Sequence, residues 1–301
     1  MGYTPLRINT ITPDKVLPFD LYIFYREVYL KYKDNGISLD QVLLQKLKEQ
    51  KIARFFITDN EEPKYQKYLD EILNNLADNQ DISIENKAEI TEGVTSNAVE
   101  KMQRDPTSKA SFNVVKTAAK NLRDVVTKNP DALKLIFSKK AGENEKIIKH
   151  SLNVCMLVIK MAEAENIVED ALDNLIVAAL LHDLGITQLS ANDQKLFEKP
   201  RKDFSVDELR TYNSHPQLST DLLKDKKYVN VEILDHIFFY SENLTGKGPQ
   251  KKTNLTKEDE ILSMINCYDK KIICQNMSPK DAIKDFQINE LGNYNLELIN
   301  T

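Results

Sequence analysis

The sequence predicts a mainly α protein with a small α/β domain at its N-terminus. From residue 141 to residue 301, apolar residues recur at the spacing that is typical of amphipathic helices. Residues 1–80 instead contain short runs of β-branched and aromatic residues with partial alternation. Glycine is rare, with 8 residues in 301, and tryptophan is absent, which favours helices over a turn-rich β fold.

The α/β domain is expected to span residues 1–80. Its predicted strands lie at residues 5–11, 19–25, 27–33 and 52–59. Ser38 is positioned to cap a helix over residues 39–50, and a second amphipathic helix is expected over 64–77. Because this domain has no histidine, no cysteine and no glycine-rich phosphate loop, we expect a regulatory or oligomerising role for it. A homodimer is one arrangement that this role leaves open.

The rest of the chain is expected to be helical. Residues 81–140 are polar and interrupted by "DPTS" and "KNP", which is typical of connector helices. Residues 141–301 carry the helical pattern to the last residue, without an internal repeat. The helices expected there lie at 145–164, 169–185, 205–213, 216–225, 230–244, 257–275 and 278–286.

Composition and charge exclude several classes of function. The formal net charge of −5 argues against nucleic acid or an anionic membrane as a bulk partner. The longest apolar run, residues 175–181, is far shorter than the roughly 20 residues that a membrane crossing needs. The three cysteines show no paired spacing, and the first residues show no apolar signal segment, so we expect a protein of the reducing cytoplasm.

All four histidines lie in the helical part of the chain, at positions 150, 182, 215 and 236. His182 and Asp183 continue the apolar face of the preceding helix, where an ionised carboxylate is costly unless it is paired or binds a metal. A buried His–Asp hydrogen bond that only ties helices together is the alternative. His215 precedes a proline and is therefore expected at a helix break. His150, taken alone, is more typical of a structural histidine than of a ligand.

The order of these residues resembles the HD superfamily of metal-dependent phosphohydrolases. His150 is followed by "HD" at 182–183, "HP" at 215–216 and "ENLTGKGP" at 242–249. This order is most similar to the HD-GYP branch, the cyclic di-GMP phosphodiesterases of bacteria, and the resemblance covers about residues 140–301. It implies an HD-type helical bundle with two, sometimes three, iron or manganese ions.

Separate segments carry this resemblance in the same order. "AALLHDLG" resembles the family's "LLHDIGK", and "EILSMINCYDK" resembles its "RILAIADVYDA". The resemblance implies that His150, His182, Asp183 and His215 are metal ligands. It also implies that Asp183 bridges two ions at the site of a metal-bridging hydroxide, which attacks the phosphodiester.

The chain departs from the family pattern at several positions. The family's double histidine falls on Tyr240–Ser241, and its metal-binding aspartate falls on Asn266, which offers a carbonyl oxygen without charge. The tyrosine of "GYP" is missing, because Pro249 directly follows Gly248. These departures leave open whether the protein binds one ion or two, and whether it is an active enzyme.

Other residues are candidates to replace the missing ligands. His236 lies one helical turn before Tyr240 on the same face, although a core histidine is the alternative. Glu242, Asn266 and Asp269 are further candidates for the metal. Lys247, Lys251 and Lys252 make the loop basic, which suits a substrate phosphate or a solvated surface equally well.

Two functions follow as hypotheses. The first is a divergent phosphodiesterase that acts on a cyclic dinucleotide, cyclic di-GMP, with an iron or manganese ion as cofactor. The second is a catalytically inactive signalling module that binds a nucleotide or a protein partner, through residues 246–249 or through the N-terminal domain. A third hypothesis is that the protein is another HD-type hydrolase, which acts on a nucleotide or an alarmone.

Overall fold

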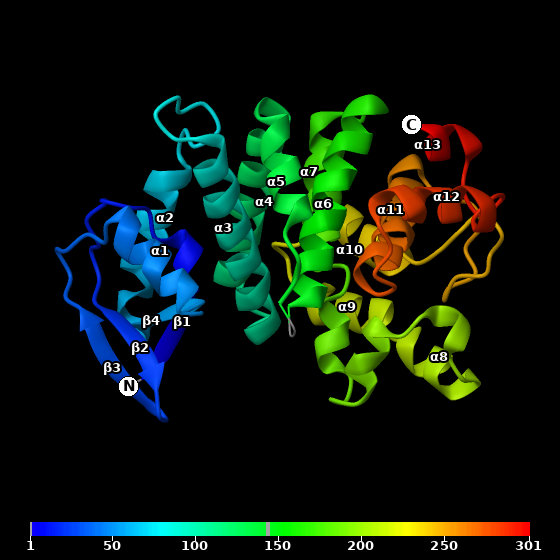
Figure 1. Ribbon diagram of the computed structural model, residues 1–301. Helices are drawn as coiled ribbons and strands as arrows, with labels where there is room; N and C mark the ends of the chain where they lie inside the picture. Colours follow the sequence, from blue (N-terminus) through cyan, green and yellow to red (C-terminus); the bar gives the residue numbers. More distant parts are fainter. Residues whose placement is uncertain (1, 143–144) are drawn as a thin grey trace. The chain divides into compact units, whose positions relative to one another are not determined.

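The computed structural model describes residues 2–142 and 145–301 (Figure 1). The chain forms two compact units. The first unit comprises Met1–Asn97 with Asp124–Ser138, and the second comprises Ala98–Arg123 with Lys139–Thr301. Among the helices of the described residues, none combines the length and the apolar character that a membrane crossing requires.

The first unit is built on a four-stranded antiparallel sheet in the order β1-β4-β2-β3. The strands are β1 (Tyr3–Arg7), β2 (Leu21–Tyr25), β3 (Val28–Lys33) and β4 (Arg54–Thr58). Arg26 and Glu27 join β2 to β3 and both have positive φ, as a two-residue hairpin turn requires. The four runs predicted as strands therefore all form strands, with shorter bounds than expected.

Helices α1 (Gln41–Glu49) and α2 (Glu62–Leu73) complete this part of the fold. Phe55 and Ile57 of β4 are fully buried, and the ring of Phe19 contacts Tyr65 and Tyr68 of α2 edge to face. The prediction that Ser38 caps α1 is wrong, because the cap is Asp40, whose side chain accepts from the backbone N–H of Leu43 at 2.7 Å.

Three helices follow, namely α3 (Ile84–Arg104), α4 (Lys109–Lys128) and α5 (Pro130–Ser138). The boundary between the compact units runs through α3 and α4, so each of these two helices contributes residues to both units. The division of the chain at residues 80 and 140 stays a prediction.

The second unit is a helical bundle. Its longer helices are α6 (Lys146–Ala164), α7 (Glu169–Leu181), α9 (His215–Leu223), α10 (Val231–Phe239), α11 (Lys257–Ile273) and α12 (Pro279–Asn289). The shorter ones are α8 (Val206–Tyr212) and α13 (Leu296–Asn300), with 3-10 turns at Leu184–Gln188, Asp193–Glu198 and Arg201–Asp203. Helix α7 is the most central, because its last seven residues are all buried, and it packs on α6 and α10 (Figure 1).

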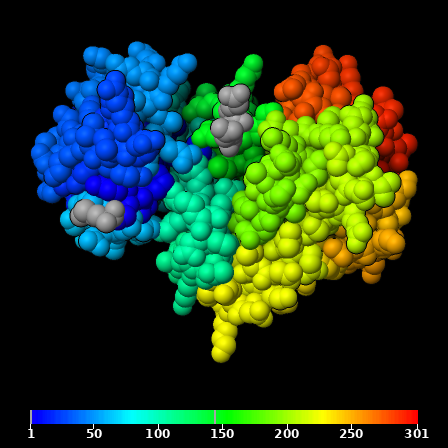
Figure 2. All heavy atoms as spheres, turned by 90° about the horizontal axis from the view of Figure 1, so that it is seen from below, coloured from blue at the N-terminus to red at the C-terminus, as the bar shows by residue number. Residues whose placement is uncertain are grey.

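Helix α9 packs against both the 3-10 turn Leu184–Gln188 and α10. In the space-filling view the yellow-green and yellow parts of the chain, to which α9 and α10 belong, lie side by side (Figure 2). The contact places the end of α7 beside the first residue of α9, and it therefore brings the "HD" and "HP" segments of the sequence together.

Candidate metal centre

His182 and Asp183 lie where α7 ends, inside the bundle. Both side chains are buried. Nδ1 of His182 lies 2.7 Å from the carbonyl oxygen of Ala179, which can only accept, so Nδ1 carries the proton. The Nε2 atom is therefore left with its lone pair, and it has no hydrogen-bond partner. The same is true of Oδ2 of Asp183, which lies 3.3 Å from this Nε2 atom.

A glycine sets the position of this turn. The backbone N–H of Gly185 donates to Oγ of Ser219 at 2.7 Å, and this hydroxyl donates to the carbonyl oxygen of His182 at 2.8 Å. A Cβ atom at residue 185 would lie 2.2 Å from the carbonyl oxygen of His215. Gly185, which lies in the 3-10 turn after α7, is thus required for close packing against α9.

His150 reaches the same point from α6. Its Nδ1 atom lies 2.7 Å from Oδ2 of Asp269, and Oδ1 of that carboxylate accepts from Nδ2 of Asn153 at 3.0 Å. Because Asp269 accepts a hydrogen bond from Nδ1–H, the lone pair of His150 lies on Nε2, the atom that can bind a cation. This Nε2 atom lies 3.7 Å from Oδ2 of Asp183 and 2.9 Å from Oδ1 of Asn266.

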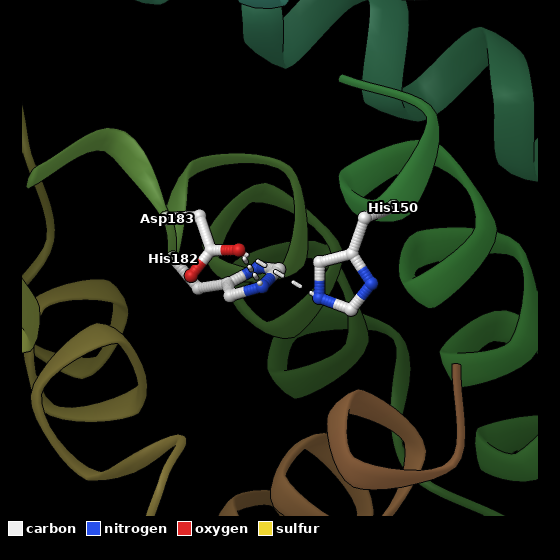
Figure 3. Close-up of side chains that lie close together, drawn as sticks. All are labelled: His150, His182 and Asp183. Carbon is white, nitrogen blue, oxygen red and sulfur yellow. Dashed lines mark ion pairs between the residues drawn. The ribbon is translucent and has the colours of Figure 1, made fainter. Parts of the chain in front are cut away.

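His150, His182 and Asp183 form one cluster, hereafter the metal cluster (Figure 3). One ligand atom from each residue lies within 4.8 Å of the other two, and within residues 2–142 and 145–301 this is the one group of this kind. Ligands about 2.1 Å from one ion stand about 3 to 4 Å apart. Oδ2 of Asp183 lies at such distances from both Nε2 atoms, 3.3 Å from that of His182 and 3.7 Å from that of His150. Two unpartnered buried atoms and an imidazole–carboxylate donor set therefore fit a divalent metal.

His215, the fourth predicted ligand, lies beside the cluster on a different side of Asp183. Its Nδ1 atom donates to the carbonyl oxygen of Tyr212, and its Nε2 atom lies 3.3 Å from Oδ1 of Asp183. The hydroxyl of Tyr240 contacts this Nε2 atom and donates to the same Oδ1 atom at 2.6 Å. Tyr240 thus stands where the sequence pattern of the family has the first residue of its double histidine.

Lys270 also belongs to this site, although the sequence did not predict it. Its Nζ atom lies 3.7 Å from Oδ2 of Asp183, donates to the hydroxyl of Tyr212 at 2.7 Å and lies 3.4 Å from the ring centre of Phe197. Lys270 follows Asn266 by four residues, so the helical spacing of α11 places both on one face. That spacing is the signal that could have identified it.

The environment sets the protonation state of these groups. Burial lowers the pKa of His150 and His215, although Asp269 and Asp183 partly oppose it. Burial alone would raise the pKa of Asp183, but the nearby His182 and Lys270 hold it well below its usual value. Neutral imidazoles and an ionised carboxylate are the states that metal ligands need. Burial raises the pKa of Tyr240 well above its usual value, so its hydroxyl keeps the proton.

His236 belongs to a second cluster, formed with α11. Its Nδ1 atom lies 2.7 Å from Oδ1 of Asp259, and Oδ2 of Asp259 lies 3.2 Å from Nζ of Lys252. This ammonium lies 3.5 Å from the ring centre of Phe239. The structure therefore pairs His236 with Asp259 rather than with Asp183, and a role for His236 as a metal ligand stays a prediction.

Glu242 organises the loop that follows α10. Its carboxylate accepts from the backbone N–H groups of Gln250, at 2.6 Å, and of Lys252, at 2.8 Å. A Cβ atom on Gly248 would lie 2.5 Å from this carboxylate, so a glycine is needed there. Lys247 and Lys251 are exposed on the loop, and their contact with a substrate phosphate stays a prediction.

A cavity of about 530 Å³ adjoins the metal cluster, with Tyr240, Asn266 and Lys270 in its wall. Its other basic residues are Lys199, Arg201, Lys202 and Lys271, the last of which pairs with Asp285 and Glu290 of the same wall. Its other aromatic residues are Phe197, Phe204, Tyr212 and Tyr294. Cationic and aromatic side chains around one cavity suit a ligand that has both phosphate and a planar ring.

Comparison with known proteins agrees with this geometry. Residues 134–284 match a family model described as HD domain. Among solved structures, the chain is similar to Bd1817, a HDG"Y"P protein from Bdellovibrio bacteriovorus. The two are 24% identical, the match covers 99% of this chain and 97% of that chain, and the TM-score is 0.81. At this identity the likeness concerns the fold. No curated protein gives a significant match to the chain.

Proposed function

Because the chain belongs to the HD domain family, we propose that it is a metal-dependent phosphohydrolase that cleaves a phosphodiester. The predicted fold, a small α/β domain followed by an HD-type helical bundle, is confirmed. The observation that carries the proposal is the pair of unpartnered buried atoms, Nε2 of His182 and Oδ2 of Asp183, which face Nε2 of His150. The resemblance to the HD-GYP branch, which the shared fold supports, makes a cyclic dinucleotide such as cyclic di-GMP the proposed substrate.

His150, His182 and Asp183 would hold the ion, with the amide oxygen of Asn266 as a neutral fourth donor. Iron and manganese both suit imidazole and carboxylate ligands. When bound, such an ion lowers the pKa of a water molecule and neutralises charge on a phosphodiester. Asp269 and the carbonyl oxygen of Ala179 keep the protons on Nδ1 of His150 and His182, so that both Nε2 lone pairs face inward.

The cavity beside the metal cluster would bind the substrate. Lys270 lines the cavity and lies 3.7 Å from Oδ2 of Asp183, and Arg201 and Lys202 line it from the segment before α8. These cations suit the phosphate groups of the substrate, and Phe204 and Tyr212, which contact each other edge to face, offer aromatic surface for a base. We propose that the lysines of this cavity, more than those of the loop, contact the phosphate.

Hydrolysis of cyclic di-GMP tests the proposal. The full chain is purified without oxygen, supplied with Fe²⁺ or Mn²⁺, and assayed by chromatography of the nucleotide products. Asp183→Asn should remove bound metal and hydrolysis together, because the amide lacks the charge that holds the ion. Hydrolysis that survives this change would contradict the proposal. A panel of nucleotides assayed in parallel separates a phosphodiesterase from another HD-type hydrolase.

A second candidate function is a module that binds a nucleotide or a protein without cleaving anything. It is favoured by the hydroxyl of Tyr240, which contacts both Oδ1 of Asp183 and Nε2 of His215. Such a module would bind cyclic di-GMP in calorimetry and show no turnover with any supplied metal. A protein partner at residues 246–249 or at the N-terminal unit belongs to this alternative.

We propose that the protein acts in the cytoplasm. Its three cysteines, Cys155, Cys267 and Cys274, are free thiols in the structure. Burial raises the pKa of Cys155 and of Cys267, so neither thiol is activated as a nucleophile.

A further inference from the structure

We propose that Tyr240 and Lys270 together take the place of a second metal ion, so that the metal cluster binds a single divalent cation. This inference rests on the proposed metal dependence of the site. It concerns the two oxygen atoms of Asp183, which the structure gives different neighbours. Oδ2 faces the Nε2 atoms of His150 and His182, whereas Oδ1 faces His215 and Tyr240.

Tyr240 occupies the position that a second ion would need. A second ion on the far side of Asp183 would need Oδ1 of Asp183 and Nε2 of His215 as ligands. The hydroxyl of Tyr240 already contacts both atoms. The residue is buried, and its ring centre lies 4.5 Å from that of His182 and 5.8 Å from that of His215. The aromatic ring is thus wedged between the two imidazoles, and the hydroxyl cannot leave without moving the ring.

Lys270 supplies the positive charge that a second ion would bring. Its ammonium lies 3.7 Å from Oδ2 of Asp183, and it is held there by the hydroxyl of Tyr212 and the ring of Phe197. The ammonium of Lys270 therefore offsets part of the negative charge of the Asp183 carboxylate. Each further cation would meet a fixed positive charge, which is costly where water is excluded. The two side chains therefore act on the same carboxylate in different ways.

Titration of the metal-free full chain with Mn²⁺ alone tests the inference, with elemental analysis to count bound ions. Wild-type protein should bind one ion per chain. Lys270→Ala should still bind one, with a dissociation constant about tenfold lower because the repulsion is removed. Tyr240→His with Lys270→Ala should bind two, since an imidazole then replaces the hydroxyl beside His215.

Matched variants control for the loss of a charge or a hydroxyl. Lys160 pairs with Glu163, and the hydroxyl of Tyr228 donates to the carbonyl oxygen of Thr107, so Lys160→Ala and Tyr228→Phe should keep the wild-type stoichiometry and affinity. If the double variant fails to fold, as circular dichroism would show, Tyr240→Phe replaces it. That variant uncovers the same two atoms and should give a second, weaker binding step.

Each outcome decides between the inference and the proposed function. Two ions in wild-type protein, or one ion in every folded variant, would overturn the inference while leaving the metal dependence intact. No bound ion in wild type or in any variant would remove the proposed function itself. One ion in wild type and two in the double variant would support both.

Discussion

Nδ1 of His150 donates to Oδ2 of Asp269 at 2.7 Å, across 119 residues of sequence, and this bond fixes which nitrogen of His150 faces Asp183. Asp269 was a candidate metal ligand in the sequence. The structure places it behind His150, where it orients the imidazole. Partners of this kind are a common part of metal sites, because they fix the tautomer and raise the basicity of the imidazole.

Asp269→Asn should therefore weaken metal binding without abolishing it. The amide can still accept from Nδ1 of His150 but brings no charge, so we expect about a tenfold higher dissociation constant for Mn²⁺. Calorimetric titration of the full chain measures this change. Asp235→Asn, on the exposed side of α10, is the matched control and should bind as wild type does. Unchanged affinity in Asp269→Asn would mean that His150 needs no such partner.

The metal-free protein should lose stability as the pH falls from 7.5 to 5.5. Burial lowers the pKa of His150 and His215 in the folded state, below the value of about 6.5 in the unfolded chain. Below pH 6.5 the unfolded state therefore binds protons that the folded state does not, and the stability present above that pH is lost. Asp183, with its lowered pKa, contributes in the same direction only below about pH 4.

Thermal unfolding in the presence of a chelator measures this dependence. His215→Gln should reduce the change in melting temperature between the two pH values, because one of the two buried imidazoles is gone. An equal melting temperature at pH 5.5 and pH 7.5 in the wild-type protein would show that neither histidine is held neutral by burial.

Glu242→Gln should loosen the loop of residues 242–252 and leave the metal affinity within about twofold of wild type. Each carboxylate oxygen accepts a backbone N–H, and the amide can replace only one of them, at a cost of about 1 to 3 kcal/mol for the donor left over. Trypsin should then cut after Lys247 or Lys251 faster than in wild-type protein. Glu232→Gln, which is exposed on α10, serves as the control. A large loss of metal affinity in Glu242→Gln would instead make Glu242 a ligand.

Much of the fold and part of the site could be predicted from sequence. The helices of residues 141–301 and the four strands followed from local periodicity, and the order of "H", "HD" and "HP" identified the family. The cap of α1 was missed because both Ser38 and Asp40 are residues that cap helices, and only the backbone decides between them.

The remaining parts of the site depend on contacts between distant segments. Helical spacing showed that His236 shares a face with Tyr240, but it could not show that Asp259, 23 residues later, pairs with His236. The roles of Tyr240 and Lys270 depend on the packing of α10 and α11 around Asp183. From its residue type alone, Tyr240 was only a position where the family's histidine is missing. In the structure its hydroxyl contacts both Asp183 and His215.

Gly185 controls how closely the segments of His182 and His215 can approach each other. The carbonyl oxygen of His215 would lie only 2.2 Å from a Cβ atom there, and Ser219 ties the two segments by hydrogen bonds. The spacing between His182 and His215 is therefore set by the lack of a side chain at a residue that touches no metal. A single methyl group at position 185 would force the segments of His182 and His215 apart, although both imidazoles would still be present.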